Sequence, residues 1–159
     1  MSSVIYVLTI VAVLGSGIVA GIFFAFSTFI MQALGRVAPA AGIAAMQQIN
    51  ITVINPLFFA AFFGTALIAI LLVVLALVQG QSALLWLVAG ALLYIVGCVA
   101  VTIIFNVPLN DALAKLAPES ADAAKLWAVY LVDWTWWNSV RTIASALAML
   151  AFVVGLTRL

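Results

Sequence analysis

Four long apolar stretches constrain the fold of this chain more than any other feature. They cover residues 4–30, 57–78, 83–105 and 134–156. Together they hold a single charged side chain, Arg141. An α-helix rises about 1.5 Å per residue, so each stretch is long enough to cross a bilayer core of about 30 Å. The sequence therefore predicts an all-α integral membrane protein with four transmembrane helices.

The composition supports a membrane environment. Of the 159 residues, 69% are hydrophobic and 6% are charged, whereas about a quarter of a soluble domain is charged. The length suits a single domain over residues 1–159. The net charge is +1 without a basic run, so no nucleic-acid partner is predicted. The first stretch follows the non-basic Met1-Ser2-Ser3 and is too long for a signal peptide, so we interpret it as a retained helix.

The connections between the stretches predict the topology. Residues 79–82 form a very short turn, so the second and third spans are adjacent and antiparallel. Residues 31–55 and 106–133 are long connectors, and each is expected to carry a short helix, over residues 44–50 and 121–132. Because the spans alternate in direction, both connectors lie on one side of the membrane and both termini on the other. The predicted architecture is an antiparallel four-helix bundle.

The basic residues favour one orientation in the membrane. Arg36, Lys115 and Lys125 lie in the long connectors, whereas Arg158 lies on the opposite side. Cytoplasmic loops of membrane proteins are enriched in Lys and Arg. The distribution favours a multi-pass protein of the cell membrane with its connector side in the cytoplasm.

Histidine is absent from the sequence, and Cys98 is the only cysteine. This composition excludes histidine-ligated haem, the common zinc and copper sites, and a histidine general base. No classical metal centre and no cofactor are predicted, although a metal held by Asp or Asn oxygens stays open. Cys98 is expected to pack as a small apolar side chain.

An aromatic and polar stripe leads into the fourth span. Four of the five tryptophans fall within residues 127–137. On one continuous helix a single face would carry Trp127, Tyr130, Trp134, Asn138 and Arg141. This face combines flat aromatic surface, an amide and a cation, and we predict that it forms a site. The neighbouring Asp133 would pair with Arg141 or Lys125 if the fold brings them together.

Two structural alternatives account for parts of this stripe. Tryptophan and tyrosine gather in aromatic belts at membrane interfaces, which suits Trp136, a residue off the stripe. Arg141 would alternatively extend its side chain to the membrane surface. The belt does not explain Asn138 and Arg141 inward of the rings, and an arginine within a span is costly unless it faces the bundle or water. We therefore interpret Arg141 as a bundle-facing functional residue.

A proline-containing segment, Asn106-Val107-Pro108-Leu109-Asn110, closes the third span. Pro108 has no N–H and disfavours helix at the residue before it, so a helix break is expected here. Asn106 and Asn110 then either satisfy the freed backbone carbonyls or face the tryptophan stripe, which lies on the same side of the membrane.

The first span supplies further candidates. Gly17 and Gly21 are expected to allow close helix packing, which also permits a homo-oligomer. Phe23, Phe26 and Ser27 approach the connector side and are expected to line a pocket there. Thr102 of the third span is expected to face inward.

These motifs together resemble the anthrone-oxygenase-like family of small four-helix membrane proteins, most of which have no assigned function. The resemblance runs over nearly the whole chain. It is carried by Gly21…Phe26…Met31, Met46-Gln47-Gln48-Ile49-Asn50…Asn55, Thr102…Asn106-Val107-Pro108-Leu109-Asn110 and Trp127…Tyr130…Trp134…Trp137-Asn138…Arg141. Two positions depart from the family pattern. Gln32 stands where the family often has Pro, and Ser139 stands where many members have His.

The resemblance implies a membrane-embedded, cofactor-independent oxygenase acting on a flat aromatic substrate, anthrone- or quinol-like, with O₂. The residues expected to contact the ring system are Trp127, Tyr130, Trp134, Trp137 and Phe26. Those expected to hold the substrate oxygen are Arg141, Asn138, Asn106 and Asn110. Asp133 is the expected base. The alternative is a non-catalytic membrane module that binds a lipid or quinone or assists a partner protein. A transporter is disfavoured because the spans contain no pair of acids.

Overall fold

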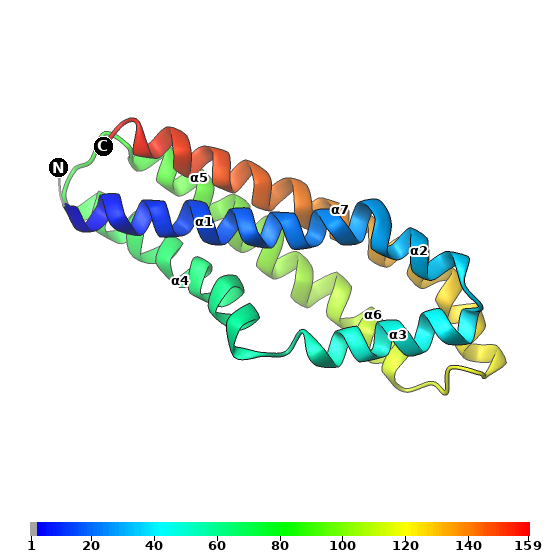
Figure 1. Ribbon diagram of the computed structural model, residues 1–159. Coiled ribbons are helices and arrows are strands. Elements are labelled where there is room, and N and C mark those ends of the chain that lie inside the picture. The colour runs from blue at the N-terminus through cyan, green and yellow to red at the C-terminus, as the bar shows by residue number, and fades with distance from the viewer. Residues whose placement is uncertain (1–2) are drawn as a thin grey trace.

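Four long helices form the protein in a computed structural model that describes residues 3–159 (Figure 1). The first helix runs continuously through α1 (Ser3–Ala25), the π-helical turn η1 (Phe26–Ile30) and α2 (Met31–Arg36). The connector helix α3 (Pro39–Thr52) leads to the second long helix, α4 (Pro56–Val78). The third runs through α5 (Leu84–Tyr94), the π-helical segments η2 (Ile95–Ala100) and η3 (Thr102–Asn106), and α6 (Val107–Ala114). The fourth is α7 (Ala121–Leu156).

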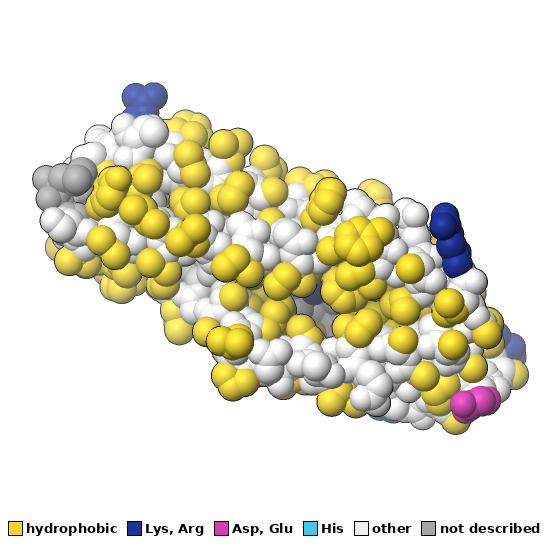
Figure 2. Space-filling view, in the orientation of Figure 1, with side chains coloured by type: hydrophobic (Ala, Val, Ile, Leu, Met, Phe, Trp, Pro, Cys, Tyr) yellow, Lys and Arg dark blue, Asp and Glu magenta, His cyan; other side chains and the backbone are white. Residues whose placement is uncertain are grey.

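The surface of these helices is that of a multi-pass membrane protein. All four are long and apolar enough to cross a bilayer. Large side chains such as Leu67, Ile143 and Leu150 are more than half exposed along them. On the face in Figure 2, hydrophobic side chains cover the middle of the molecule, and the charged ones on its outer surface stand near the two ends. With no strand among residues 3–159, the predicted all-α membrane bundle is confirmed.

The two ends of the bundle differ as the alternation of spans predicts. The start of α1, the C-terminus and the turn between α4 and α5 lie at one end, and the connectors lie at the other (Figure 1). The turn uses Gly80 at a φ of 60°, a conformation that favours glycine. The Ser82 hydroxyl then donates to the Arg158 carbonyl at 2.6 Å, which joins the turn to the C-terminus.

The predicted break at Pro108 is wrong, because the third helix continues through it. Proline removes a backbone donor and crowds the carbonyl four residues earlier. The helix accommodates this by widening in η3, where the Val107 N–H donates to the carbonyl of Thr102, five residues back. The face of this helix therefore extends to Ala114.

The connector end carries a second core outside the main bundle. At about 1.5 Å per residue α7 is about 54 Å long, well beyond a bilayer core of about 30 Å. The predicted short helix over residues 44–50 lies within α3, and the one predicted over 121–132 is the first part of α7 rather than a separate element. Packed between these elements is a cluster that includes Met31, Ile43, Met46, Leu113, Trp127 and Tyr130.

Of the glycine pair expected to allow close packing in the first span, Gly17 does so, since a methyl group there would lie 3.0 Å from Met149 Sδ of α7. Closer approaches occur between the third and fourth helices. A methyl group on Gly90 would lie 2.6 Å from the Phe152 ring, and one on Gly97 would lie 2.6 Å from the Ala144 side chain. These positions bring the third and fourth helices together. Gly21, by contrast, is exposed and has nothing within 4 Å of such a group, so the predicted close approach at Gly21 is wrong.

Candidate functional site

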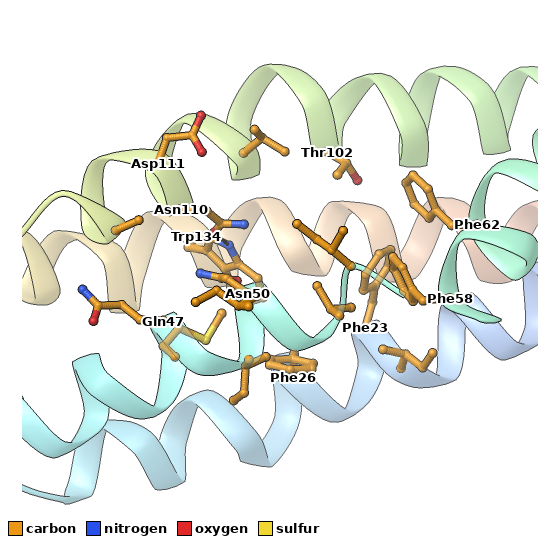
Figure 3. Close-up of a pocket in the computed structure, with 18 of the residues that line it drawn as sticks. Phe23, Phe26, Gln47, Asn50, Phe58, Phe62, Thr102, Asn110, Asp111 and Trp134 are labelled. Carbon is orange, nitrogen blue, oxygen red and sulfur yellow. Dashed lines mark hydrogen bonds between the residues drawn. The ribbon is translucent and has the colours of Figure 1, made fainter. Parts of the chain in front are cut away.

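A cavity of about 810 Å³ opens on the side of the bundle near its connector end. Figure 3 shows its walls, which come from all four long helices and from α3. The polar side chains that line it are Gln47, Gln48, Asn50, Thr102, Asn110, Asp111 and Arg141. Aromatic rings make up much of the rest: Phe23, Phe26, Phe58, Phe59, Phe62, Phe63 and Trp134.

Arg141 is the basic residue of this cavity, and only 4% of its surface is exposed. Its Nη2 donates to Asn138 Oδ1 at 2.7 Å, and its Nη1 donates to Thr102 Oγ1 at 3.2 Å. Its Nε has no partner. The one ion pair found within residues 3–159 joins Lys125 to Asp122, so no carboxylate of this part of the chain neutralises Arg141. In Figure 2 a basic side chain is visible inside a hollow near the middle of the molecule.

Aromatic rings surround the guanidinium. Its Cζ lies 4.0 Å from the centroid of the Phe23 ring and 5.2 Å from that of Trp134. Each such contact contributes about 0.5–2 kcal/mol. A charge inside a span nonetheless remains expensive without an anion. Since the guanidinium has more N–H donors than its two hydrogen bonds use, the site is suited to a ligand oxygen that carries negative charge.

Asn138 holds this cation in place. Its Nδ2 donates to the Phe23 carbonyl and to Ser27 Oγ, both at 2.7 Å, so the amide is fixed against the first helix and its Oδ1 points to Arg141. Asn138 is fully buried and does not line the cavity. We therefore regard it as a positioning residue rather than a ligand contact.

The two departures from the family pattern fall outside the cavity wall. Ser139 shares a 2.9 Å hydrogen bond with Ser27 and does not line the cavity. Gln32 is exposed on α2. Neither departure removes a side chain from the lining.

The predicted aromatic stripe is present on one buried face of α7. The rings of Trp127, Tyr130 and Trp134 are stacked in series, with centroid separations of 5.5 and 5.7 Å. Asn110 Oδ1 accepts hydrogen bonds from the Tyr130 hydroxyl at 2.7 Å and from Trp134 Nε1 at 2.8 Å. The third helix and the stripe thus meet as expected. Of the three rings only Trp134 reaches the cavity, so Trp127 and Tyr130 support it from behind.

Two other predicted site residues lie outside the cavity lining. Asn106 is buried and its Nδ2 donates to the Trp134 carbonyl at 3.1 Å, away from the cavity lining. Trp137 stacks on Phe105 with ring centroids 3.7 Å apart and is also outside the lining. Trp136 is 66% exposed, as the belt interpretation requires.

The predicted base is not at the cavity. Asp133 is on the exposed face of α7, does not line the cavity and makes no ion pair with Arg141 or Lys125. The carboxylate in the lining is that of Asp111, which sequence reasoning missed. The feature of the sequence that could have identified Asp111 is its helical spacing from other lining residues. Once the helix continues through Pro108, one face carries Ile103, Val107, Asn110, Asp111 and Ala114 at i, i+4, i+7, i+8 and i+11.

The aromatic wall on α4 was also missed. Phe58 and Phe62 stack at 5.5 Å, and Phe59 and Phe63 meet edge-to-face at 5.5 Å. In the sequence they read as ordinary apolar residues of a span, because nothing in their spacing distinguishes a cavity wall from a lipid-facing surface. Only the neighbouring helices decide that difference.

The search for metal ligands and the comparisons with known proteins complete the description of the site. Within residues 3–159 no three His, Cys, Asp or Glu side chains come together in a way that could hold a metal ion. Comparison with curated proteins and with solved structures gives no match. The model of the anthrone oxygenase family, however, matches residues 56–151, which is more than half of the chain. The matched part includes Asn110, Trp134 and Arg141. The protein therefore belongs to the anthrone oxygenase family.

Proposed function

We propose that the protein is a membrane-embedded oxygenase that acts with O₂ on a flat aromatic substrate of the anthrone or quinol type. The observation that carries this proposal is Arg141, a buried cation without a carboxylate partner in a cavity walled by aromatic rings. Such a cation is suited to a substrate that becomes an oxyanion during the reaction.

The chemistry is balanced for an anthrone without an external reductant. A base removes a proton from the methylene carbon, and the resulting negative charge rests largely on the carbonyl oxygen. The electron-rich carbon then reacts with O₂ to form a carbon-bound hydroperoxide. Loss of water leaves a second carbonyl, so one oxygen atom ends in the quinone product and the other in water. The electrons that O₂ accepts all come from the substrate carbon.

Each part of the cavity has a role in this proposal. Arg141 holds the developing oxyanion, and Thr102, which accepts from it at 3.2 Å, orients the guanidinium. The stacked Phe58 and Phe62 rings, with Trp134 on the other side, provide flat walls. Asp111 takes the role of proton acceptor that the sequence assigned to Asp133, because it lines the cavity.

The test is O₂ uptake by the purified protein in lipid vesicles supplied with anthrone. We expect uptake above the spontaneous rate, and we expect Arg141→Ala to abolish the excess. Unchanged uptake in that variant would refute the oxyanion role. Gln79→Ala, a change in the exposed turn at the opposite end, is the control.

A non-catalytic module that binds a lipid or quinone is the second candidate. The favouring observation is that some apolar residues of the lining, such as Ile54 and Ile103, are also more than half exposed on the outer surface of the protein. Native mass spectrometry of the protein released from vesicles separates the two. A retained lipid or quinone together with no O₂ uptake would favour the module.

We also propose that the protein lies in the cell membrane with its connector side in the cytoplasm, as the connector residues Arg36, Lys115 and Lys125 suggest. Cys98 is fully buried. A cysteine introduced at the exposed Glu119 is therefore a clean probe of the connector side, and one at Gln79 probes the other side. In intact cells, an impermeant maleimide should label Gln79→Cys and leave Glu119→Cys unlabelled. The reverse pattern would invert the orientation.

A further inference from the structure

We infer that the cavity takes its ligand sideways from the bilayer, through a portal between the first turns of α4 and the η3–α6 part of the third helix. One edge of this portal consists of Phe59 and Phe63, and the other of Ile103 and Val107. Each of the four lines the cavity and is also exposed on the outer surface.

The α4 edge of the portal is at a depth that corresponds to the hydrocarbon core of a bilayer. Phe63 is fifteen residues from the end of α4 at Val78, or about 22 Å along the helix axis. Measured from the terminal end of the bundle, this position is inside a bilayer core of about 30 Å. By the same measure Ile103 is about 28 Å and Val107 about 34 Å from the start of α5 at Leu84. The opening therefore faces acyl chains along its α4 edge and reaches the connector-side boundary of the hydrocarbon core at its other edge.

The chemistry of the lining changes from the portal inward. The edges are apolar, whereas Arg141 and Thr102 lie in the interior of the lining and are mostly buried. In Figure 3, Thr102 lies on the third helix opposite Phe58 and Phe62 of α4. A ligand that enters by this route meets apolar and aromatic contacts first and the cation last. This order suits a polycyclic molecule with one weakly acidic oxygen.

Such a molecule resides in the membrane before it binds. Withdrawal of its large apolar surface from water favours the bilayer strongly. The fraction of the ligand that is dissolved in water is therefore small, and a route through the bilayer uses the larger, membrane-bound fraction. The competing route starts in water at the connector end, where Gln47 and Asp111 line the cavity. This inference depends on the proposed function only for the choice of probe, anthrone.

The experiment measures anthrone association with the full-length protein in phosphatidylcholine vesicles under strict exclusion of O₂. Quenching of tryptophan emission reports binding, because Trp134 lines the cavity. The portal variant combines Ile103→Phe with Val107→Phe. The matched control combines Ile104→Phe with Val96→Phe, which are the same changes on the same helix at exposed residues outside the lining.

We expect the portal variant to slow association about tenfold or more, and the control to leave the rate unchanged. A second measurement uses the wild-type protein and so does not depend on folding of a variant. Diluting the vesicles with buffer at a fixed ratio of anthrone to lipid should leave the observed rate constant unchanged. Equal rates in portal and control variants, or a rate constant that falls with dilution, would overturn the inference.

The outcome is independent of oxygenation. If association depends on the portal and O₂ uptake is absent in air, the proposed function fails and the lateral route stands. If O₂ uptake is present and association ignores the portal substitutions, the lateral route fails and the proposed function stands.

Discussion

The energetic balance at Arg141 separates a functional role from a structural one. An arginine at the centre of a span costs about 2.5–3.5 kcal/mol on insertion scales. Removing it would leave the buried Asn138 Oδ1 without its donor, at a cost of about 1–3 kcal/mol. These two free energies nearly cancel, so Arg141 contributes little to the stability of the fold.

We therefore predict that Arg141→Met changes the free energy of unfolding by no more than about 2 kcal/mol. The same change should lower anthrone-dependent O₂ uptake at least about 100-fold, as loss of an oxyanion donor does. Thermal unfolding in detergent and O₂ uptake in vesicles give the two readings. A variant that unfolds and loses activity together would instead identify Arg141 as a structural residue.

Asp111 and Asp133 give a matched pair of carboxylates at the connector end. Both are exposed, but only Asp111 lines the cavity. Loss of a general base costs about 100- to 10,000-fold in rate. Asp111→Asn should therefore lower the turnover number for anthrone by that range, and Asp133→Asn should leave it within about twofold. Equal activity of the two variants would remove Asp111 from the mechanism.

At the scale of elements, the contact between Gly90 of α5 and Phe152 of α7 sets how closely these two helices approach each other. A Cβ on Gly90 would lie 2.6–2.9 Å from three atoms of the Phe152 ring. Overpacking of this kind costs about 1–3 kcal/mol. Gly90→Ala should therefore lower the thermal midpoint in detergent.

Gly64 of α4 is the control for that change. A Cβ there meets nothing within 4 Å, and alanine in a helix is favoured over glycine by up to about 1 kcal/mol. Gly64→Ala should leave the midpoint unchanged or raise it. If both variants behave alike, the close approach of α5 and α7 does not limit stability.

The helices also show which kinds of inference the sequence allows. The stripe from Trp127 to Arg141 was predictable because a 3.6-residue period on a continuous helix fixes which residues share a face. The continuation through Pro108 was not, since proline in a helix leads either to a break or to local widening, and the local sequence does not distinguish the two. That one difference concealed Asp111 and the face beside it.

For the whole molecule, the hydropathy and length of the apolar stretches were sufficient to predict four spans that alternate in direction. They were sufficient because a bilayer requires every backbone polar group within it to be satisfied internally, which leaves helices as the solution for such stretches. The cavity was not predictable, because it is enclosed by residues of α4, the third helix and α3, which come together only in the folded protein. No local pattern in Phe58 to Phe63 encodes that arrangement.

The most direct test of the account follows isotopically labelled O₂ into the product formed from anthrone by the protein in vesicles. The proposed reaction places one labelled oxygen atom in the quinone and the other in water. We predict labelled quinone at a rate above the protein-free control with the wild-type protein, and only the protein-free rate with Arg141→Met. Label incorporation by the variant at the wild-type rate, or none above the protein-free control by the wild-type protein, would contradict an oxygenase built around Arg141.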